Sequence, residues 1–263
     1  MKTVTLNPPD YSKTVQDILK AHGGTATVSR TSYTVTIKTD NRKYLLASRA
    51  LPVKYHGLAA RMRKEALERR TEVGGLELWG NIPGAGQDVP KYHRFASDAL
   101  PSSAVCVDIS AAYPSTMGMA QMVAPQTIRR IMALPKPDRL TVVGMLATRK
   151  HVTRYECGEC AWVEVTESPT KRAFFALCAK VGDVMDAGAT MAGADFLLYW
   201  VDGAFVRREA APAFADYLRS HGYAVTVSEV TNIRRSRHGN YIGYTKDGAN
   251  TYLCVPQRKT VAV

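Results

Sequence analysis

Two aspartates far apart in the sequence are the first residues whose type and position suggest chemistry. Asp108 falls near the end of the apolar run Ala104–Ile109, and Asp202 precedes Gly203 in a dipeptide typical of tight hairpins. Carboxylates that converge from separate elements are the hard oxygen ligands that Mg²⁺ prefers. Two divalent ions about 3.5–4 Å apart can activate a 3′ hydroxyl and stabilise a leaving pyrophosphate. Taken singly, each aspartate is as well explained by a turn or a cap, so a metal site is predicted only if they meet.

The elements around these aspartates predict that they do meet. Residues 103–230 give, in order, a strand, a long helix, two strands joined in a hairpin, a second helix and a last strand. The expected ranges are Ala104–Ile109, Thr170–Met191, Phe196–Val201, Ala204–Arg207, Ala211–His221 and Tyr223–Val230, with the hairpin turn at Asp202-Gly203. This β-α-β-β-α-β order is the split ferredoxin-like arrangement, an α+β fold. The first and third strands of its sheet are neighbours, which places Asp108 beside Asp202.

Three further segments are predicted outside this unit. Residues 1–50 form a small α+β unit, with a helix after Asp10 that ends at Gly23 and strands near 33–37 and 43–47. Residues 51–102 form a basic helix, 57–70, followed by a linker rich in Gly, Pro and Asp. Residues 231–263 form a β-rich C-terminal segment with a hairpin that turns at Asp247-Gly248.

An insertion at about 112–169 is expected to interrupt the unit of 103–230. Its sequence predicts a helix up to Met122, another helix from Pro125, and strands Leu140–Thr148 and Trp162–Thr166. Between these strands lies Cys157-Gly-Glu-Cys160. A lone Cys-x-x-Cys pair supplies only two of the four ligands that structural zinc needs, so this motif favours a tight turn and not zinc.

The charge balance of the chain favours a polyanionic partner. Lys and Arg number 35 against 23 Asp and Glu, a net charge of +12, which predicts salt-sensitive binding. A basic enzyme that does not bind nucleic acid has the same composition. The sequence contains no apolar run of about 18 residues and its first nine residues are polar, so we expect no membrane partner. Five cysteines do not suggest a disulfide framework, and a reducing cytoplasm is the expected location.

Both aspartates lie in segments that resemble motifs of one enzyme family. Residues 107–115, Val-Asp-Ile-Ser-Ala-Ala-Tyr-Pro-Ser, resemble motif A of the family B DNA polymerases, Asp-x-x-Ser-Leu-Tyr-Pro-Ser, with Ala111 and Ala112 in place of Ser and Leu. Residues 198–203, Leu-Tyr-Trp-Val-Asp-Gly, resemble motif C, Tyr-x-Asp-Thr-Asp-Ser. Asp202 then matches the second Asp of motif C, and Trp200 replaces the first.

The resemblance implies a polymerase palm and gives roles to its residues. Asp108 and Asp202 would be the catalytic metal ligands for Mg²⁺ or Mn²⁺, with the backbone of Ile109 adding a carbonyl. Tyr113 would lie under the incoming sugar and exclude a 2′ hydroxyl, although a core tyrosine that supports the start of a helix fits the same position.

The other two family motifs are matched more loosely. At the place of motif B, the segment from Thr170 to Gly182 lacks the family's Asn and Tyr. Lys171 or Arg172 would bind a triphosphate there, although an exposed basic helix start fits these residues equally well. Arg129 and Arg130 are alternative triphosphate contacts, and the short insertion implies shortened fingers. A C-terminal group resembles the segment around the primer-binding Lys-x-Tyr strand, with Asn250 where the Lys is expected. Its residues are Arg234, Arg235, Arg237, Lys246 and Tyr252.

Together these patterns predict a template-dependent nucleotidyltransferase, a minimal DNA polymerase or primase-polymerase. Its partners would be a DNA primer-template, deoxynucleoside triphosphates and, as an open alternative, a replication protein. Such a reduced enzyme suits a virus or a mobile element. Two alternatives remain: a non-catalytic nucleic-acid-binding module of the RNA-recognition type, and a degenerate palm retained as a replication initiator.

Overall fold

The computed structural model describes residues 2–6, 10–31, 34–47, 55–72, 93–96, 100–157, 159–237 and 241–254. The chain is an α+β protein that divides into two compact units. The first unit contains Met1–Ile82 and Ala120–Ala176, and the second contains Pro83–Met119 and Leu177–Val263. Residues 120–176, which the sequence analysis assigned mostly to an insertion in the palm, therefore group with the N-terminal residues.

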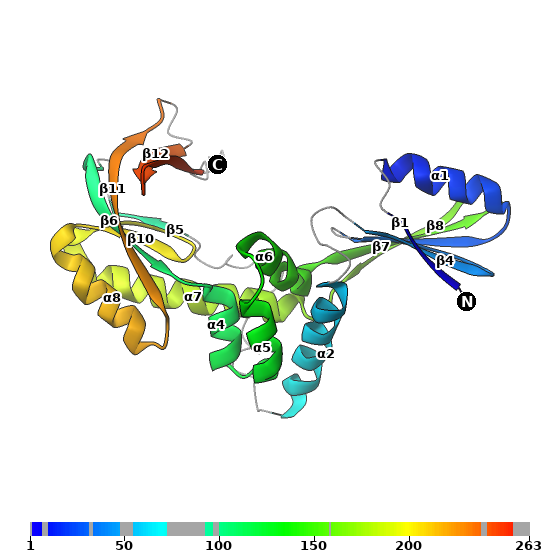
Figure 1. Cartoon of the computed structure of the whole chain (residues 1–263), viewed down its shortest axis with the longest axis horizontal. Coiled ribbons are helices and arrows are strands. Elements are labelled where there is room, and N and C mark those ends of the chain that lie inside the picture. Colours follow the sequence, from blue (N-terminus) through cyan, green and yellow to red (C-terminus); the bar gives the residue numbers. More distant parts are fainter. Residues whose placement is uncertain are drawn as a thin grey trace, which may run out of the picture. The chain divides into compact units, whose positions relative to one another are not determined.

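A six-stranded sheet with the order β1-β4-β3-β2-β7-β8 forms the first unit's larger part (Figure 1). Its strands are β1 (Lys2–Leu6), β2 (Ala26–Arg30), β3 (Thr34–Thr39), β4 (Arg42–Ala47), β7 (Arg149–Glu156) and β8 (Glu159–Glu167). Neighbouring strands are antiparallel except β1 and β4. Because β7 pairs with β2, the hairpin of β7 and β8 extends the N-terminal sheet. This long-range pairing explains why residues 149–167 belong to the first unit.

Helix α1 (Tyr11–His22) covers one part of this sheet and begins and ends as predicted. The Asp10 carboxylate accepts a hydrogen bond from the Lys13 N–H at 3.0 Å, which is an N-cap. Gly23 has φ 65° and donates its N–H to the Leu19 carbonyl, which is a left-handed C-cap. Val15 and Leu19 pack on buried strand residues. The strands near 33–37 and 43–47 are confirmed as β3 and β4, whereas β1 and β2 were missed.

The other described residues of the first unit are mainly helical, in α2 (His56–Glu72), α5 (Pro125–Met132), α6 (Lys136–Gly144) and the first part of α7 (Lys171–Ala192). The prediction of a strand at Leu140–Thr148 is wrong, because these residues lie in α6, in a 3₁₀ turn (Met145–Ala147) and at Thr148, which precedes β7. The β-branched run Thr141-Val142-Val143 favours a strand locally. Tertiary packing overrides this preference, since Val142 and Val143 are both buried.

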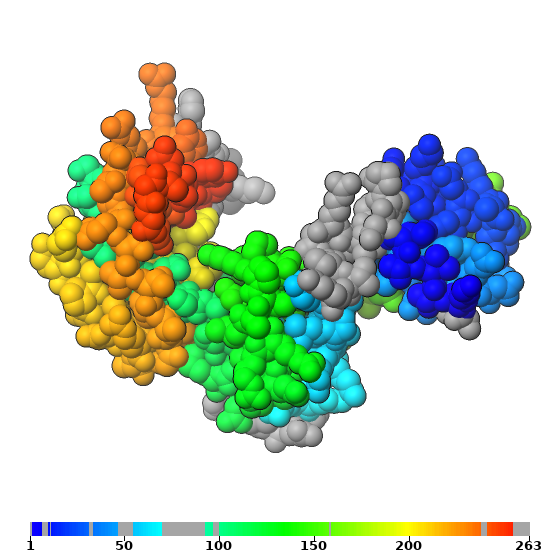
Figure 2. Space-filling model, viewed as in Figure 1, coloured from blue at the N-terminus to red at the C-terminus, as the bar shows by residue number. Residues whose placement is uncertain are grey.

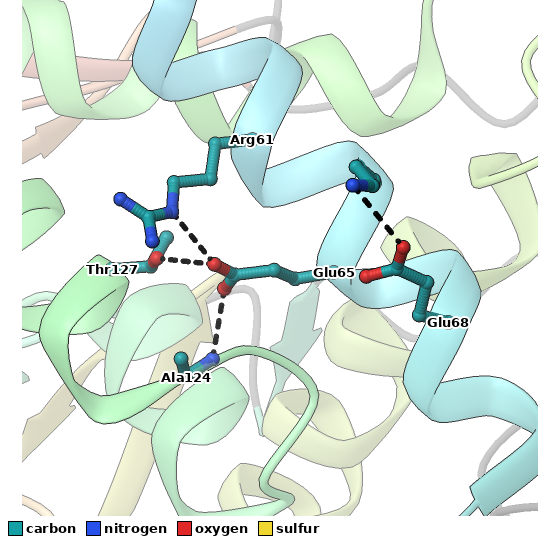
Figure 3. A network of polar contacts seen from close by, with 6 residues as sticks. Arg61, Glu65, Glu68, Ala124 and Thr127 are labelled. Carbon is teal, nitrogen blue, oxygen red and sulfur yellow. Dashed lines mark hydrogen bonds and ion pairs between the residues drawn. The ribbon is translucent and has the colours of Figure 1, made fainter.

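Glu65 of α2 connects that helix to the start of α5 (Figure 3). Its carboxylate accepts hydrogen bonds from the Ala124 N–H at 2.9 Å, the Thr127 hydroxyl at 3.0 Å and Arg61 Nε at 2.9 Å. Ala124 is the N-cap residue of α5 and has no capping side chain of its own. Glu65 therefore satisfies the orphan amide of a helix to which it does not belong.

The second unit contains a seven-stranded sheet with the order β13-β12-β11-β6-β10-β9-β5, and all its neighbouring strands are antiparallel. Its strands are β5 (His93–Phe95), β6 (Ser103–Ile109), β9 (Phe196–Trp200), β10 (Gly203–Val206), β11 (Val225–Arg235), β12 (Tyr241–Lys246) and β13 (Ala249–Cys254). The predicted C-terminal hairpin is confirmed, and it extends the sheet of β6. The predicted linker contains β5, while 73–92 and 97–99 lie outside the described residues.

The two faces of this sheet are covered differently, as Figure 1 shows. Helices α7 (Lys171–Ala192) and α8 (Ala211–Ser220) pack on one face, where Val105, Val107 and Ile109 of β6 join their buried side chains. Ala104 and Cys106 point to the opposite face and belong to a second cluster. The sheet curls over this second cluster. The curl brings Tyr244 of β12 edge-on against Phe205 of β10, with the ring centroids 4.9 Å apart, although two strands separate β12 from β10. Burial on both faces explains the continuous apolar run of β6.

Candidate metal site

The two predicted aspartates lie next to each other in the second unit, Asp108 on β6 and Asp202 in the turn between β9 and β10. Asp108 of β6 is directly opposite Gly203 of β10, and Asp202 immediately precedes that glycine. The backbone N–H of Ile109 donates a hydrogen bond of 2.8 Å to the carbonyl of Asp202. The main chains of the two aspartates are therefore in contact, although residues 109–201 separate them in the sequence.

Asp108 lies on the sheet face opposite α7 and α8, beside a buried thiol. Cys106 lies two residues before Asp108 and thus shares its face. Burial raises the pKa of the Cys106 thiol to about 11, and the negative charges of Asp108 and Asp202 also raise it. The ammonium group of Lys246 opposes this rise and donates a hydrogen bond to Cys106 Sγ at 3.8 Å.

The turn that holds Asp202 differs by one residue from the predicted turn. Gly203 pairs with Trp200, so the two turn residues are Val201 and Asp202, and Gly203 is already the first residue of β10. Val201 carries the turn's positive φ, 57°, which is unfavourable for a β-branched residue. Ala111, in the turn after Asp108, also has a positive φ of 54°. Both aspartates are thus held next to strained turns, a feature common at functional sites.

Relief of the strain at Val201 gives a testable expectation. We expect Val201→Asn to raise the free energy of unfolding by about 1 kcal/mol, because Asn tolerates the left-handed conformation that costs other residues roughly that amount. Urea unfolding of the variant measures the change. Val227→Asn is the control, since Val227 is a valine of the same unit that lies on β11 with an extended backbone, and this variant should lose stability. A gain in both variants would contradict the explanation.

Gly203 is required here by the closeness of the Asp108 carboxylate and not by turn geometry. A Cβ atom added at Gly203 would lie 2.9 Å from Asp108 Oδ1, closer than such contacts ever are. The sequence suggested a turn glycine, so this role was missed. The signal that could have revealed it is the cross-strand register, which the sequence does not specify.

We therefore expect Gly203→Ala to displace the Asp108 carboxylate at little cost in stability, since the atom that must move ends a side chain. Affinity for Mn²⁺ should fall by about 10–100-fold, as for other losses of ligand positioning. Isothermal titration with Mn²⁺ measures this, and thermal unfolding measures stability. In an Asp108→Asn background the same substitution should cause no additional loss. An additive loss there would show that Gly203 acts elsewhere.

The donor set fits a hard cation that completes its shell with other oxygens. No group of three or more His, Cys, Asp or Glu side chains that could hold a metal ion occurs among the described residues. Mg²⁺ is commonly held by one or two carboxylates together with water and substrate phosphates, so Asp108 and Asp202 suffice for it. Ile109 has an apolar side chain, which is buried in the helix-covered face, so the predicted ligand atom of this residue is its backbone carbonyl oxygen.

The residue that stands where the resembled motif C has its first Asp, Trp200, is used in packing. Trp200 is half-buried and lies against His93 of β5, with ring centroids 5.3 Å apart. Burial lowers the pKa of His93. Tyr113, in the first turn of α4 (Ala112–Met119), is half-buried and packs against the helix-side core, so the predicted sugar contact and the alternative core role both remain.

The four predicted triphosphate contacts all belong to the first unit. Arg129, Arg130 and Arg172 are exposed, and Lys171 forms an ion pair of 2.5 Å with Glu167. Lys171 Nζ also lies 5.7 Å from the centroid of the Phe175 ring. Since the aspartates belong to the second unit, these residues form no shared site with them inside one compact unit. Their assignment to nucleotide binding remains a prediction.

The C-terminal residues predicted to contact nucleic acid point to two different faces. Lys246 reaches Cys106, and the Arg235 guanidinium lies 5.8 Å from the centroid of the Phe95 ring, both on the face of the aspartates. Arg234 and Tyr252 are exposed on the other face, and Arg237 is exposed beyond β11. These C-terminal residues thus belong to two surfaces, whereas the sequence predicted a single nucleic-acid-binding group.

The Cys-x-x-Cys motif lies at the tip of the β7–β8 hairpin. Glu156 pairs with Glu159, Cys157 has φ 52°, and both cysteines are free and exposed. The motif therefore forms part of a tight connection between two strands.

Comparisons of the chain with protein-family models, with curated proteins and with solved structures found no match. Within the described part of the chain, no helix is both long enough and apolar enough to cross a membrane.

Proposed function

We propose that this chain is a template-dependent nucleotidyltransferase, a minimal DNA polymerase or primase-polymerase with a ferredoxin-like palm. The observation that supports this most strongly is the contact between the main chains of Asp108 and Asp202. Asp108 is opposite Gly203 on the neighbouring strand, and Asp202 directly precedes that glycine. Both residues therefore stand at the same end of these two strands, as a shared cation site requires.

The strand order supports the palm topology. The four strands β11-β6-β10-β9 lie in this order, with α7 before β9 and α8 between β10 and β11. The same order is expected when a β-α-β-β-α-β chain folds into one antiparallel sheet. Both helices pack on one face, and Asp108 shares the opposite face with Cys106.

In this proposal, Asp108 and Asp202 hold Mg²⁺ or Mn²⁺, and the carbonyl of Ile109 is a further ligand. Bound ions of this kind would lower the pKa of a 3′ hydroxyl and neutralise charge on a triphosphate. Gly203 keeps the Asp108 carboxylate in position, and the strained turn at Val201 fixes where Asp202 stands. The net charge of +12 favours the approach of a polyanionic primer-template.

The test is extension of a primed DNA template by the full chain with deoxynucleoside triphosphates and Mg²⁺ or Mn²⁺. We expect incorporation that requires the divalent ion and follows the template sequence. Nucleic-acid binding that is unaffected by EDTA, with no incorporation in either metal, would overturn the proposal. That result would favour the non-catalytic module or the degenerate initiator, for which the loss of the motif C carboxylate at Trp200 is the supporting observation.

A further inference from the structure

The outer face of the C-terminal strands carries two exposed tyrosines that the proposed catalysis does not use. In the register of β11, β12 and β13, Arg234 pairs with Gly243, which in turn pairs with Tyr252. Tyr241 lies two residues from Gly243 on the same strand and therefore shares its face. We call these four residues, Arg234, Tyr241, Gly243 and Tyr252, the tyrosine face.

The tyrosine face is separated from the aspartates by the sheet itself. Ile242, Tyr244 and Leu253 alternate with its residues and point inward to the cluster that includes Cys106. Asp108 shares the face of Cys106, so a ligand on the tyrosine face lies on the other side of the strands. Figure 2 shows β12 and β13, in orange and red, at the molecular surface.

The geometry of the tyrosine face suits flat ligands. Tyr252 is 69% exposed and Tyr241 is 47% exposed, so each ring offers a free surface. Their centroids are 6.4 Å apart and the ring planes form an angle of 69°. Gly243 places no side chain between Arg234 and Tyr252 in the row that joins them. Rings this exposed bury little apolar surface when the chain folds, so packing in the core does not explain the presence of the two tyrosines.

The charge around the tyrosine face favours a phosphate-bearing ligand. Arg234 belongs to it, and Arg237 is exposed just beyond the end of β11. Among residues 230–237 and 241–254, the single acidic residue is Asp247, in the turn between β12 and β13. Exposed aromatics next to arginines, without acidic neighbours, are the usual means of binding single strands, in which bases stack and phosphates are neutralised.

We propose that the tyrosine face binds single-stranded nucleic acid, with bases stacked on Tyr252 and Tyr241 and phosphates held by Arg234 and Arg237. Duplex is a poorer ligand because its bases are stacked on one another and offer no free faces. This site goes beyond the proposed catalysis and does not depend on it. The tyrosine face would hold an unpaired stretch of a nucleic-acid strand on the side of the β-sheet that faces away from Asp108.

The experiment is fluorescence anisotropy of a labelled oligothymidylate of about 16 nucleotides, titrated with the full chain in EDTA. We expect Tyr252→Ala and Tyr241→Ala each to weaken binding by roughly tenfold, and Tyr252→Phe to retain it, since stacking needs the ring and not the hydroxyl. Trp162→Ala is the matched control, because Trp162 is as exposed as Tyr241, at 47%, but lies on β8 of the first unit. Its affinity should equal that of the wild type.

Each outcome decides the proposal. Unchanged affinity in both tyrosine variants, or equal binding of a duplex of the same length, would overturn it and indicate electrostatic attraction alone. Asp108→Asn should bind the oligonucleotide normally in EDTA. A chain that fails to extend a primer can still satisfy this test, and an active polymerase can fail it, so the two proposals are separable.

Discussion

Asp108→Asn and Asp202→Asn are each expected to reduce nucleotide incorporation by on the order of 10³-fold, since each removes a preorganised charge that stabilises the transition state. The double variant should be little worse than either single one, because the two carboxylates act as one unit. Asn keeps the size of the side chain and removes only its charge. Primer extension with Mg²⁺ and with Mn²⁺ measures the loss.

A second measurement separates a metal ligand from a structural aspartate. Mn²⁺ should raise the melting temperature of the wild type and not that of the variants, since only a bound ligand stabilises the native state. Asp216→Asn, on the exposed surface of α8, is the control and should behave as the wild type in both assays. Full activity in the double variant would end the two-metal proposal.

The sequence predicted those elements whose signals are local. The apolar run of β6, the long α7, the helix α8 with Gly222 after it and the Asp247-Gly248 turn are all present. The meeting of Asp108 and Asp202 followed from strand order alone, because neighbouring strands in such a sheet leave little choice of partner. These features depend on periodicity and turn residues, which a single sequence contains.

The missed features depend on contacts between distant segments. The pairing of β7 with β2 moves residues 149–167 into the first unit, and no local signal encodes it. In the C-terminal strands, a register shift between Thr231 and Arg234 determines which arginine points outward. A shift of one residue reverses the face of every side chain that follows. The separation of Arg234 from Arg235, and with it the tyrosine face, was therefore not available from the sequence.

The second large effect on stability is expected at the start of α5, which is capped by Glu65 of another helix, α2. Glu65 is half-buried, and its three hydrogen bonds hold α2 against the first turn of α5 (Figure 3). Burial raises the pKa of this carboxyl, but the bonds from Ala124, Thr127 and Arg61 and the charge of Arg61 outweigh burial and lower it overall. The ionised form is therefore the one that the folded first unit stabilises.

We expect Glu65→Ala to cost about 2–3 kcal/mol at neutral pH, the range for buried hydrogen bonds to a charged group, because the Ala124 amide loses its partner. Glu68→Ala is the matched control one turn away, since Glu68 is exposed and forms a surface ion pair with Lys64 at 3.5 Å; it should cost under about 1 kcal/mol. The pKa of Glu65 is lower in the folded chain than in the unfolded chain, where it is about 4.3. The stability that Glu65 contributes is therefore fully present above the unfolded pKa and is lost as the pH falls through the folded pKa.

Urea unfolding at pH 7 should give different free energies of unfolding for the two variants, and this difference should shrink in acid. Faster amide hydrogen exchange in α5 of the Glu65 variant would locate the loss, whereas equal costs for both glutamates would show that the cap contributes nothing.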